Sequence, residues 1–355
     1  MNLPLIVHTL AGGEAGGAET ACLDTVLAQH EAGWPVRVVL RPHAERQRLL
    51  KEAGITYATA PFGGVFDLWT PLYLRWLFRR WQPRIVQTWM RRAAEKTPRS
   101  SHYKTIARLG GYYKVTAFKG ADAFIAAAPD IGRHLETHKV PRAKITVIPH
   151  FVDFCQNVPA VDRATLDTPK DAFVLLFLGR LHKSKAADVL LEALALVPGV
   201  YLWLAGTGDE ETALRSLCQR LNLEDRVRFL GWRTDRGALL QAADAVVFPS
   251  RYEPVGRVLF EAWAATKPLI VSMAAGPLQY VTEGETGLFV PIDDAPALAA
   301  AIKRVREDKS LGEHLAHQGR RRYVQYYTKA AVLEAYHRLY AEISLRHTNA
   351  SPPSR

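Results

Sequence analysis

The strongest constraint on the fold is the alternation of short apolar segments with longer amphipathic ones along most of the chain. Apolar residues recur at helical spacing between the short segments, as in residues 18–31 and 68–81. Six expected strands of the first half are Leu3–Thr9, Val36–Leu40, Ile85–Thr88, Thr105–Arg108, Ala123–Ala126 and Ile145–Ile148. Such alternation is typical of a parallel sheet with helices on both faces. We therefore predict an α/β protein.

The alternation stops once and then starts again. Residues 149–171 contain Pro149, Pro159 and Pro169 and show no clear period, which indicates an interdomain linker. Six further strands are expected after it: Phe173–Leu178, Val200–Ala205, Val227–Leu230, Ala245–Phe248, Leu269–Val271 and Gly287–Val290. A length of 355 residues also suits two domains.

We place the two doubly wound domains at residues 1–160 and 161–328. Residues 329–346 form an expected C-terminal helix that can pack back on the N-terminal domain, and residues 347–355 an expected disordered tail.

Composition and the N-terminus favour a cytoplasmic protein. Apolar residues make up 48% of the chain and charged residues 23%, as in ordinary globular proteins. No apolar run approaches the ~20 residues of a membrane-spanning helix, and the first ten residues lack the features of a signal peptide. Three widely separated cysteines, Cys22, Cys155 and Cys218, form no metal-binding spacing, so we expect no metal site.

Positive charge is concentrated in one segment. The chain carries a net charge of +11, and residues 75–119 hold twelve Lys or Arg against one acid, Glu95. Aromatic residues lie among these charges. A basic, aromatic surface suits anionic lipid headgroups, acidic glycolipids or nucleic acid, although a merely solvated face has the same composition.

Three loops at expected strand ends have the residues of a ligand site, because ligands of open parallel sheets bind beyond the carboxyl ends of the strands. Residues 12–19 are rich in glycine and precede an expected helix. This segment suits either an anion-binding site at the helix start or a tight turn between strand and helix without a ligand. Residues 179–185 place cations after a glycine, which suits a diphosphate or a solvated loop.

The third loop, residues 250–262, carries two carboxylates. Glu253 precedes an expected helix start at Gly256, and Glu261 lies inside that helix. A carboxylate before such a helix can accept hydrogen bonds from sugar hydroxyls, and one within it can bind ribose hydroxyls. Favourable charge at a helix N-terminus explains the first carboxylate but not the second.

These residues resemble glycosyltransferase family 4, the retaining GT-B enzymes. The resemblance covers roughly residues 173–292 and is weak in the N-terminal half, where it rests on residues 16–19. Its motifs are Phe177-Leu178-Gly179-Arg180 with Lys185, Leu204-Ala205-Gly206-Thr207-Gly208, Glu253-Pro254-Val255-Gly256 with Glu261, and Gly284-Glu285-Thr286-Gly287. The resemblance implies a GT-B fold, in which two Rossmann-like domains face each other, the first binding acceptor and the second nucleotide-sugar.

The resemblance also implies roles for particular residues. Arg180 and Lys185 would bind the donor diphosphate and stabilise the leaving group, so that no metal or other cofactor is needed. Glu253 would bind the donor sugar and Glu261 the ribose, and the expected catalytic residues are Glu253, Arg180 and Lys185. The remaining expected donor-binding residues are Gly16, Gly17, Gly179, Gly256, Val258 and Leu259. An acceptor or membrane face would include Arg91, Arg92, Arg108, Tyr112 and Tyr113.

The sequence departs from the family pattern at several positions. Ala186 stands where the family often has glycine, and Gln279 where an acid is common. Many members place a histidine at the end of an N-domain strand, but the loop after Arg108 has none. His102 and His150 are poor substitutes for it, because a lone histidine is more often structural.

The resemblance implies a retaining, metal-independent hexosyl or glycosyl transfer from a nucleotide-diphosphate sugar, with UDP preferred over GDP or ADP. The expected acceptor is an anionic glycolipid or lipid-linked glycan of lipopolysaccharide or cell-surface polysaccharide biosynthesis, met at the inner face of the cytoplasmic membrane. Alternatives are another GT-B chemistry, such as an epimerase or phosphorylase, and a non-catalytic binder of membranes or nucleic acid. No nucleic-acid-binding signature accompanies the basic segment, so we expect no nucleic-acid partner.

Overall fold

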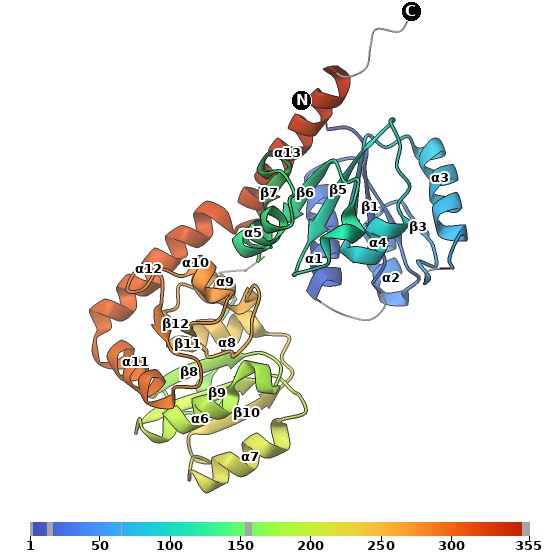
Figure 1. Ribbon diagram of the computed structural model, residues 1–355. Coiled ribbons are helices and arrows are strands. Elements are labelled where there is room, and N and C mark those ends of the chain that lie inside the picture. The colour runs from blue at the N-terminus through green and yellow to red at the C-terminus, as the bar shows by residue number, and fades with distance from the viewer. Residues whose placement is uncertain (1–2, 13–16, 65, 153–157, 350–355) are drawn as a thin grey trace, which may run out of the picture. The chain divides into compact units, whose positions relative to one another are not determined.

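The computed structural model describes residues 3–12, 17–64, 66–152 and 158–349, and it divides the chain into two compact units (Figure 1). Unit 1 comprises Met1–His150 together with Lys329–Arg355, and unit 2 comprises Phe151–Thr328. The sequence prediction put the boundary after residue 160, whereas the two units divide after His150. The C-terminal helix belongs to unit 1.

Unit 1 is built on a parallel sheet of seven strands in the order β3-β2-β1-β4-β5-β6-β7. The strands are β1 (Ile6–Leu10), β2 (Val36–Leu40), β3 (Tyr57–Thr59), β4 (Ile85–Trp89), β5 (Lys104–Leu109), β6 (Ala123–Ala126) and β7 (Ile145–Val147). Every residue of β1 and β4 is buried, as expected for central strands covered on both faces. The sequence prediction lacked β3, because three half-buried residues at a sheet edge have no readable period.

Helices cover both faces of this sheet (Figure 1). They are α1 (Gly17–Glu31), α2 (Ala44–Glu52), α3 (Trp69–Trp81), α4 (Met90–Lys96), α5 (Pro129–Thr137) and α13 (Lys329–Asn349). Helix α13 is held by aromatic contacts, since the ring of Tyr340 lies 6.1 Å from that of Trp34, just after α1.

Unit 2 repeats the same plan with six parallel strands in the order β10-β9-β8-β11-β12-β13. The strands are β8 (Phe173–Leu178), β9 (Val200–Ala205), β10 (Val227–Gly231), β11 (Ala245–Phe248), β12 (Leu269–Ser272) and β13 (Leu288–Val290). The helices are α6 (Ala187–Ala195), α7 (Glu211–Arg220), α8 (Arg236–Ala242), α9 (Arg257–Ala264), α10 (Pro277–Tyr280), α11 (Ala295–Glu307) and α12 (Lys309–Tyr326). Each sheet therefore reverses its strand order once, between β1 and β4 and between β8 and β11, and such switch points bind ligands.

The predicted linker is wrong over its second part. The backbone N–H of Val161 donates to the carbonyl of Ala238 at 3.2 Å, which attaches this part of the chain to α8. Arg163 donates to the carbonyl of Ala242 and pairs with Asp244 at 2.9 Å. One arginine thus ties a segment without sequence periodicity to the body of unit 2.

A chain of buried polar groups joins α13 to the sheet of unit 1. The Trp89 indole N–H donates to Nδ1 of His8 at 3.0 Å, and Nε2 of His8 lies 2.9 Å from Oε1 of Gln29. The amide of Gln29 donates to the Tyr340 hydroxyl, which donates to Gln87 at 2.7 Å. Buried polar groups are stable only when hydrogen-bonded, so this chain favours one placement of α13.

We predict that His8 makes unit 1 sensitive to acid. Burial lowers the pKa of His8 to about 4, well below its usual value of 6.5. As the pH falls below 6.5, His8 takes up a proton in the unfolded chain but not in the native state. The free energy of unfolding therefore decreases as the pH decreases from 6.5 to about 4, by at most about 3 kcal/mol.

Urea unfolding of the wild type and of His8→Gln between pH 4 and pH 8 measures this difference. We expect the wild type to lose more stability toward low pH than the variant, because glutamine does not titrate. Parallel losses in the two proteins would show that other groups set the acid sensitivity.

Candidate functional site

The best-formed candidate site of unit 2 lies at the switch point between β8 and β11. The loop after β8 runs from Gly179 to Ala186, and the loop after β11 runs from Pro249 to Gly256. The backbone N–H of Arg251 donates to the carbonyl of Ser184 at 2.9 Å, so the two loops are joined directly. The structure thus brings together the two predicted loops.

Arg251 fastens the loops in place, a role that the sequence analysis missed. Its guanidinium pairs with Asp188 at the start of α6 at 2.6 Å and with Asp293 at 2.5 Å. It also donates to the carbonyl of Lys183 at 2.7 Å. Because its partners lie far away in the sequence, no local pattern indicates this role.

Glu253 is held in one orientation by backbone and side-chain donors. Its Oε1 accepts from the N–H of Gly256 at 3.1 Å, and its Oε2 pairs with Nζ of Lys185. Gly256 has φ 80°, which favours glycine, and a Cβ on Gly276 would lie 2.6 Å from the Glu253 carbonyl oxygen. The glycines of the motif therefore let the chain close tightly around this carboxylate.

Lys185 and Arg180, the two cations predicted to bind the diphosphate, differ in their burial and in their partners. Lys185 is half-buried, pairs with Glu253 and lies 5.4 Å above the ring of Phe248. Arg180 is exposed, and no described residue accepts a hydrogen bond from it or pairs with it. Ala186 has φ 54°, so the loop keeps the left-handed turn at a position where the family often has glycine.

Glu261 is buried in α9 and pairs with Arg236 of α8 at 2.5 Å. Burial raises the pKa of Glu261, and the charges of Arg236 and Arg257 partly oppose that rise. The sequence analysis did not include Arg236. A single cation at the start of a short helix gives no signal in the sequence that it faces a carboxylate from another helix.

The start of α9 supplies one available backbone donor. The N–H of Leu259 already donates to the carbonyl of Gly256 at 3.2 Å. The N–H of Val258 has no acceptor among the described residues. Of the two expected donor-binding residues at this helix start, Val258 is therefore the better placed to donate a backbone hydrogen bond.

The structure brings together three of the predicted residues of unit 1, since Arg91, Arg92 and Tyr113 line one cavity. Gly17 is the first residue of α1, and Gly16 lies outside the described residues. Arg91 pairs with Glu95 at 3.0 Å, while Arg92 is exposed. Tyr112 is exposed, and burial raises the pKa of the half-buried Tyr113.

The prediction that Arg108 belongs to an exposed face is wrong. Arg108 is only 2% exposed and lies 4.9 Å from the ring of Trp89 and 5.7 Å from that of Tyr336. It donates to the carbonyl of Ile148 at 2.9 Å, and its second terminal nitrogen lies 3.3 Å from Nδ1 of His150. Arg108 packs between α13 and the sheet, so it is not part of an open acceptor surface.

The described part of the chain offers neither a metal-ligand group nor a membrane-spanning helix. No three His, Cys, Asp or Glu side chains among the described residues are grouped as metal ligands. No helix among them is both long enough and apolar enough to span a membrane.

Comparison with known proteins finds two family matches that together cover most of the chain. Residues 160–322 match the family described as glycosyl transferases group 1. Residues 15–154 match glycosyltransferase family 4. The first match contains every candidate site residue of unit 2.

Two relatives are similar over nearly their whole length. The lipopolysaccharide core biosynthesis glycosyltransferase LpsE of Rhizobium meliloti is 35% identical over 331 residues, which is 93% of this chain and 97% of LpsE. LpsD of the same organism is also 35% identical, over 93% of this chain and 96% of LpsD. Among solved structures, Anabaena HepE in complex with UDP matches with a TM-score of 0.81 and 20% identity, covering 96% of this chain and 100% of HepE.

Proposed function

The chain belongs to the group 1 and family 4 glycosyltransferases and has their GT-B fold, and from this premise we propose that it is a retaining, metal-independent enzyme that uses a nucleotide-diphosphate sugar. The observation that supports the proposal most is the cluster of Arg180, Lys185, Glu253 and Glu261 at one switch point. Such a donor carries an anionic diphosphate between the hydroxyls of the ribose and those of the sugar. Cations suit the diphosphate, and carboxylates suit the hydroxyls on either side of it. We propose UDP as the preferred nucleotide, since solved GT-B neighbours include complexes with UDP.

Arg180 and Lys185 bind the diphosphate in this proposal, together with the N–H of Val258. As the bond between the anomeric carbon and the phosphate oxygen breaks, negative charge grows on that oxygen. Fixed cations stabilise this charge, which lowers the barrier. The two side chains supply the positive charge that a metal ion supplies in other enzymes, so the reaction needs no metal or other cofactor.

The two carboxylates orient the donor. Glu253 accepts from hydroxyls of the sugar, and Glu261 accepts from the ribose. An acceptor hydroxyl attacks the anomeric carbon from the face that the phosphate leaves, and its proton passes to the leaving phosphate oxygen. The new glycosidic bond then has the configuration of the donor.

We propose that the acceptor is a glycan or lipid-linked glycan of lipopolysaccharide core biosynthesis. The similarity to LpsE and LpsD supports this assignment, because it extends over both units and so includes the acceptor-binding half. Such acceptors are assembled on lipid, which places the enzyme at the cytoplasmic face of the inner membrane.

Helix α3 is the surface best suited to meet that membrane. Trp69, Leu72 and Trp76 are all more than half exposed on one side of the helix. The ring of Tyr73 stacks between the two indoles, 4.7 Å from Trp69 and 5.8 Å from Trp76. Exposed tryptophans beside basic residues are typical of helices that lie in a membrane interface.

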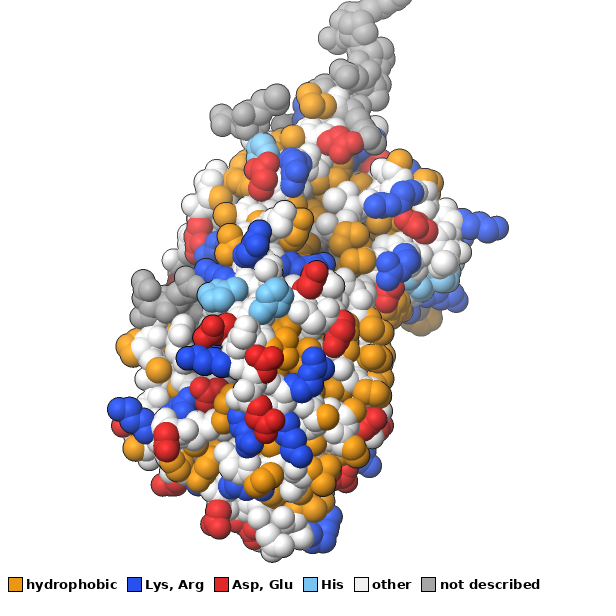
Figure 2. All heavy atoms as spheres, turned by 90° about the vertical axis from the view of Figure 1, so that its left-hand side faces the viewer, with side chains coloured by type: hydrophobic (Ala, Val, Ile, Leu, Met, Phe, Trp, Pro, Cys, Tyr) orange, Lys and Arg blue, Asp and Glu red, His pale blue; other side chains and the backbone are white. Residues whose placement is uncertain are grey.

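The last turns of α3 add positive charge, since Arg75, Arg79 and Arg80 are exposed. Each such charge near an anionic membrane contributes about 1 kcal/mol of binding. On the face shown in Figure 2, by contrast, blue and red side chains are interspersed. We therefore propose α3 as the membrane-binding surface, in place of the predicted face around Arg91, Arg92 and Tyr112.

Vesicle sedimentation tests this surface. We expect wild type to bind vesicles with anionic lipid more tightly than neutral ones, and Trp69→Ala/Trp76→Ala to bind both more weakly. Trp232→Ala is the matched control, because Trp232 is 73% exposed and belongs to unit 2. Equal binding of the double variant and the wild type would contradict the proposal.

A thermal-shift screen tests the proposed donor. Wild type is melted with UDP, GDP, ADP and CMP, each with and without EDTA. Ligand at a hundred times its dissociation constant stabilises the fold by about 2.7 kcal/mol, so UDP should raise the melting temperature plainly and EDTA should not change the rise. If no nucleotide raises the melting temperature, the non-catalytic alternative gains support.

A further inference from the structure

Two adjoining cavities lie along the carboxyl edge of the sheet in unit 1. The first, of about 430 Å³, is lined by Ala11 and Gly12 after β1 and by Met90 after β4, so it lies at the switch point of this sheet. The second, of about 480 Å³, lies between α4 and the short helix η1 (Val115–Phe118). Arg91 and Glu95 line both cavities. Each cavity is large enough for one sugar residue.

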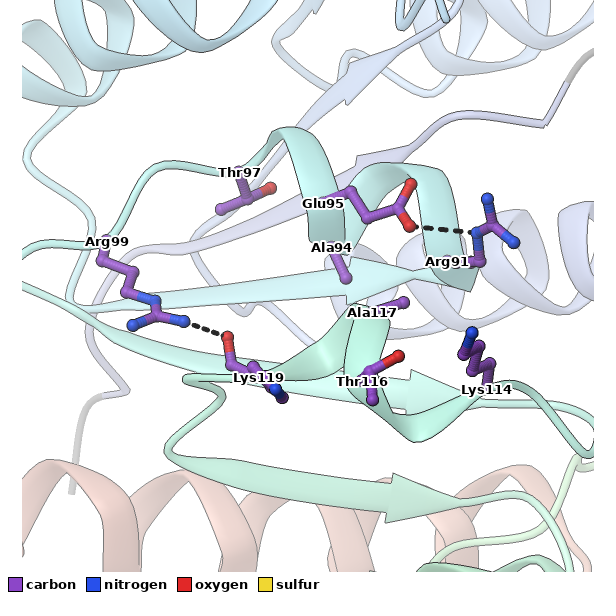
Figure 3. Close-up of a pocket in the computed structure, with 9 residues that line it drawn as sticks. All are labelled: Arg91, Ala94, Glu95, Thr97, Arg99, Lys114, Thr116, Ala117 and Lys119. Carbon is purple, nitrogen blue, oxygen red and sulfur yellow. Dashed lines mark hydrogen bonds and ion pairs between the residues drawn. The ribbon is translucent and has the colours of Figure 1, made fainter. Parts of the chain in front are cut away.

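The second cavity is strongly basic. Four cations line it, Arg91, Arg99, Lys114 and Lys119, against one acid, Glu95. Figure 3 shows Arg91 and Lys114 toward one end of the cavity, and Arg99 and Lys119 toward the other. Positive charge is therefore present along its whole length.

The contacts within the cavity leave two of these cations available. Arg91 pairs with Glu95 at 3.0 Å, and Arg99 donates to the carbonyl of Lys119 (Figure 3). Lys114 and Lys119 are exposed, and no acidic side chain among the described residues pairs with either ammonium group. The hydroxyl of Thr116 also lines the cavity. Such a cavity binds an anion in preference to a neutral group.

We propose that the second cavity binds an anionic substituent of the acceptor, a phosphate monoester or a carboxylate. This inference rests on the proposed function, because it assigns the switch-point cavity to the acceptor sugar whose hydroxyl attacks the donor. The neighbouring sugar then lies beyond Arg91 and Glu95 in the second cavity, where Lys114 and Lys119 attract its anionic group. The enzyme would thereby select acceptors that carry a negative charge next to the reacting sugar.

Binding of three simple probes tests the site in the full chain. Glucose 6-phosphate carries a phosphate monoester, glucuronate carries a carboxylate, and glucose carries neither. We expect calorimetry at low salt to show that one or both anionic sugars bind at least about tenfold more tightly than glucose, since hydrogen bonds to charged groups are stronger than those between neutral groups. The comparison of the two anionic probes identifies which anion the cavity prefers.

The variant Lys114→Gln/Lys119→Gln removes the two available cations. It should lose about tenfold or more in affinity for the preferred probe, since a charged donor is lost at each position. Lys51→Gln/Lys144→Gln changes the net charge equally at two exposed lysines of unit 1 that do not line the cavity. This control should bind like wild type.

Two results would overturn the inference: equal affinity of wild type for glucose and for both anionic sugars, or unchanged binding by the cavity variant. The stabilisation by UDP separates this failure from a failure of the proposed function, because that site lies in unit 2. If UDP stabilises wild type and no anionic sugar binds, only the acceptor site is wrong. If UDP does not stabilise wild type but the anionic sugars bind through Lys114 and Lys119, the cavity is an anion site and the proposed donor site is contradicted.

Discussion

Replacing Lys185 with alanine is expected to lower kcat by about 10²–10³-fold, the usual cost of removing one donor that stabilises charge in the transition state. The structure places its ammonium group against Glu253 and over the ring of Phe248. In that position it faces the proposed diphosphate, whose leaving oxygen gains charge as the bond between that oxygen and the anomeric carbon breaks. The effect should therefore fall on kcat more than on the KM for the donor.

Lys183→Ala is the control for this prediction. Lys183 lies two residues earlier in the same loop and is exposed, and only its backbone carbonyl contacts Arg251. The steady-state rate of this variant with a UDP-sugar should be close to that of wild type. A loss of less than threefold in Lys185→Ala, or an equal loss in both variants, would remove Lys185 from the proposed mechanism. Melting temperatures of the variants show whether the loop still folds.

Replacing Glu261 with alanine is expected to weaken UDP binding by about ten- to a hundredfold, because hydrogen bonds to a charged group contribute about 1.5–3 kcal/mol. Glu261 is buried, and its Oε2 pairs with Arg236 at 2.5 Å, which orients the carboxylate. The thermal shift with UDP should nearly disappear in this variant. Glu224→Ala, at a surface glutamate of the same unit, should keep the full shift.

The pH dependence of UDP binding gives a second measurement at the same residue. Burial raises the pKa of Glu261, so this carboxylate takes up its proton at a higher pH than an exposed glutamate does. The affinity of wild type for UDP should fall as the pH falls through that range. Glu261→Gln has no such proton to take up, and the titration of UDP itself is common to both proteins. Identical pH profiles would show that Glu261 does not contact the nucleotide.

Much of the fold followed from local pattern. Every strand predicted from an apolar run is present, because buried parallel strands need apolar residues on both faces. The edge strand β3 was missed, since three half-buried residues carry too little pattern to be distinguished from a loop. Residues 161–171 were predicted to be part of the linker, and the tertiary hydrogen bonds of Val161 and Arg163 show that this segment belongs to unit 2.

The candidate site was only partly predictable. The structure places Glu261 inside α9, as predicted, and it pairs Lys185 with Glu253, a contact that the sequence did not indicate. Composition alone misplaced Arg108, because a count of charges cannot distinguish an exposed arginine from one packed between Trp89 and Tyr336. The exposed tryptophans of α3 became distinguishable from core aromatics only through their burial.

Strand and helix periods and motif spacing are local properties, so the sequence was enough to predict the two α/β units, the family and the residue types of the proposed donor site. The distant side chains that support this site became known from the tertiary structure. Arg251 reaches Asp188 and Arg236 reaches Glu261 because the strand order of unit 2 brings their loops and helices together. The cavity between α4 and η1 has the same origin, since its cations come from segments that meet only when β4 and β5 pair. Contacts of this kind depend on chain topology, which no short stretch of sequence contains.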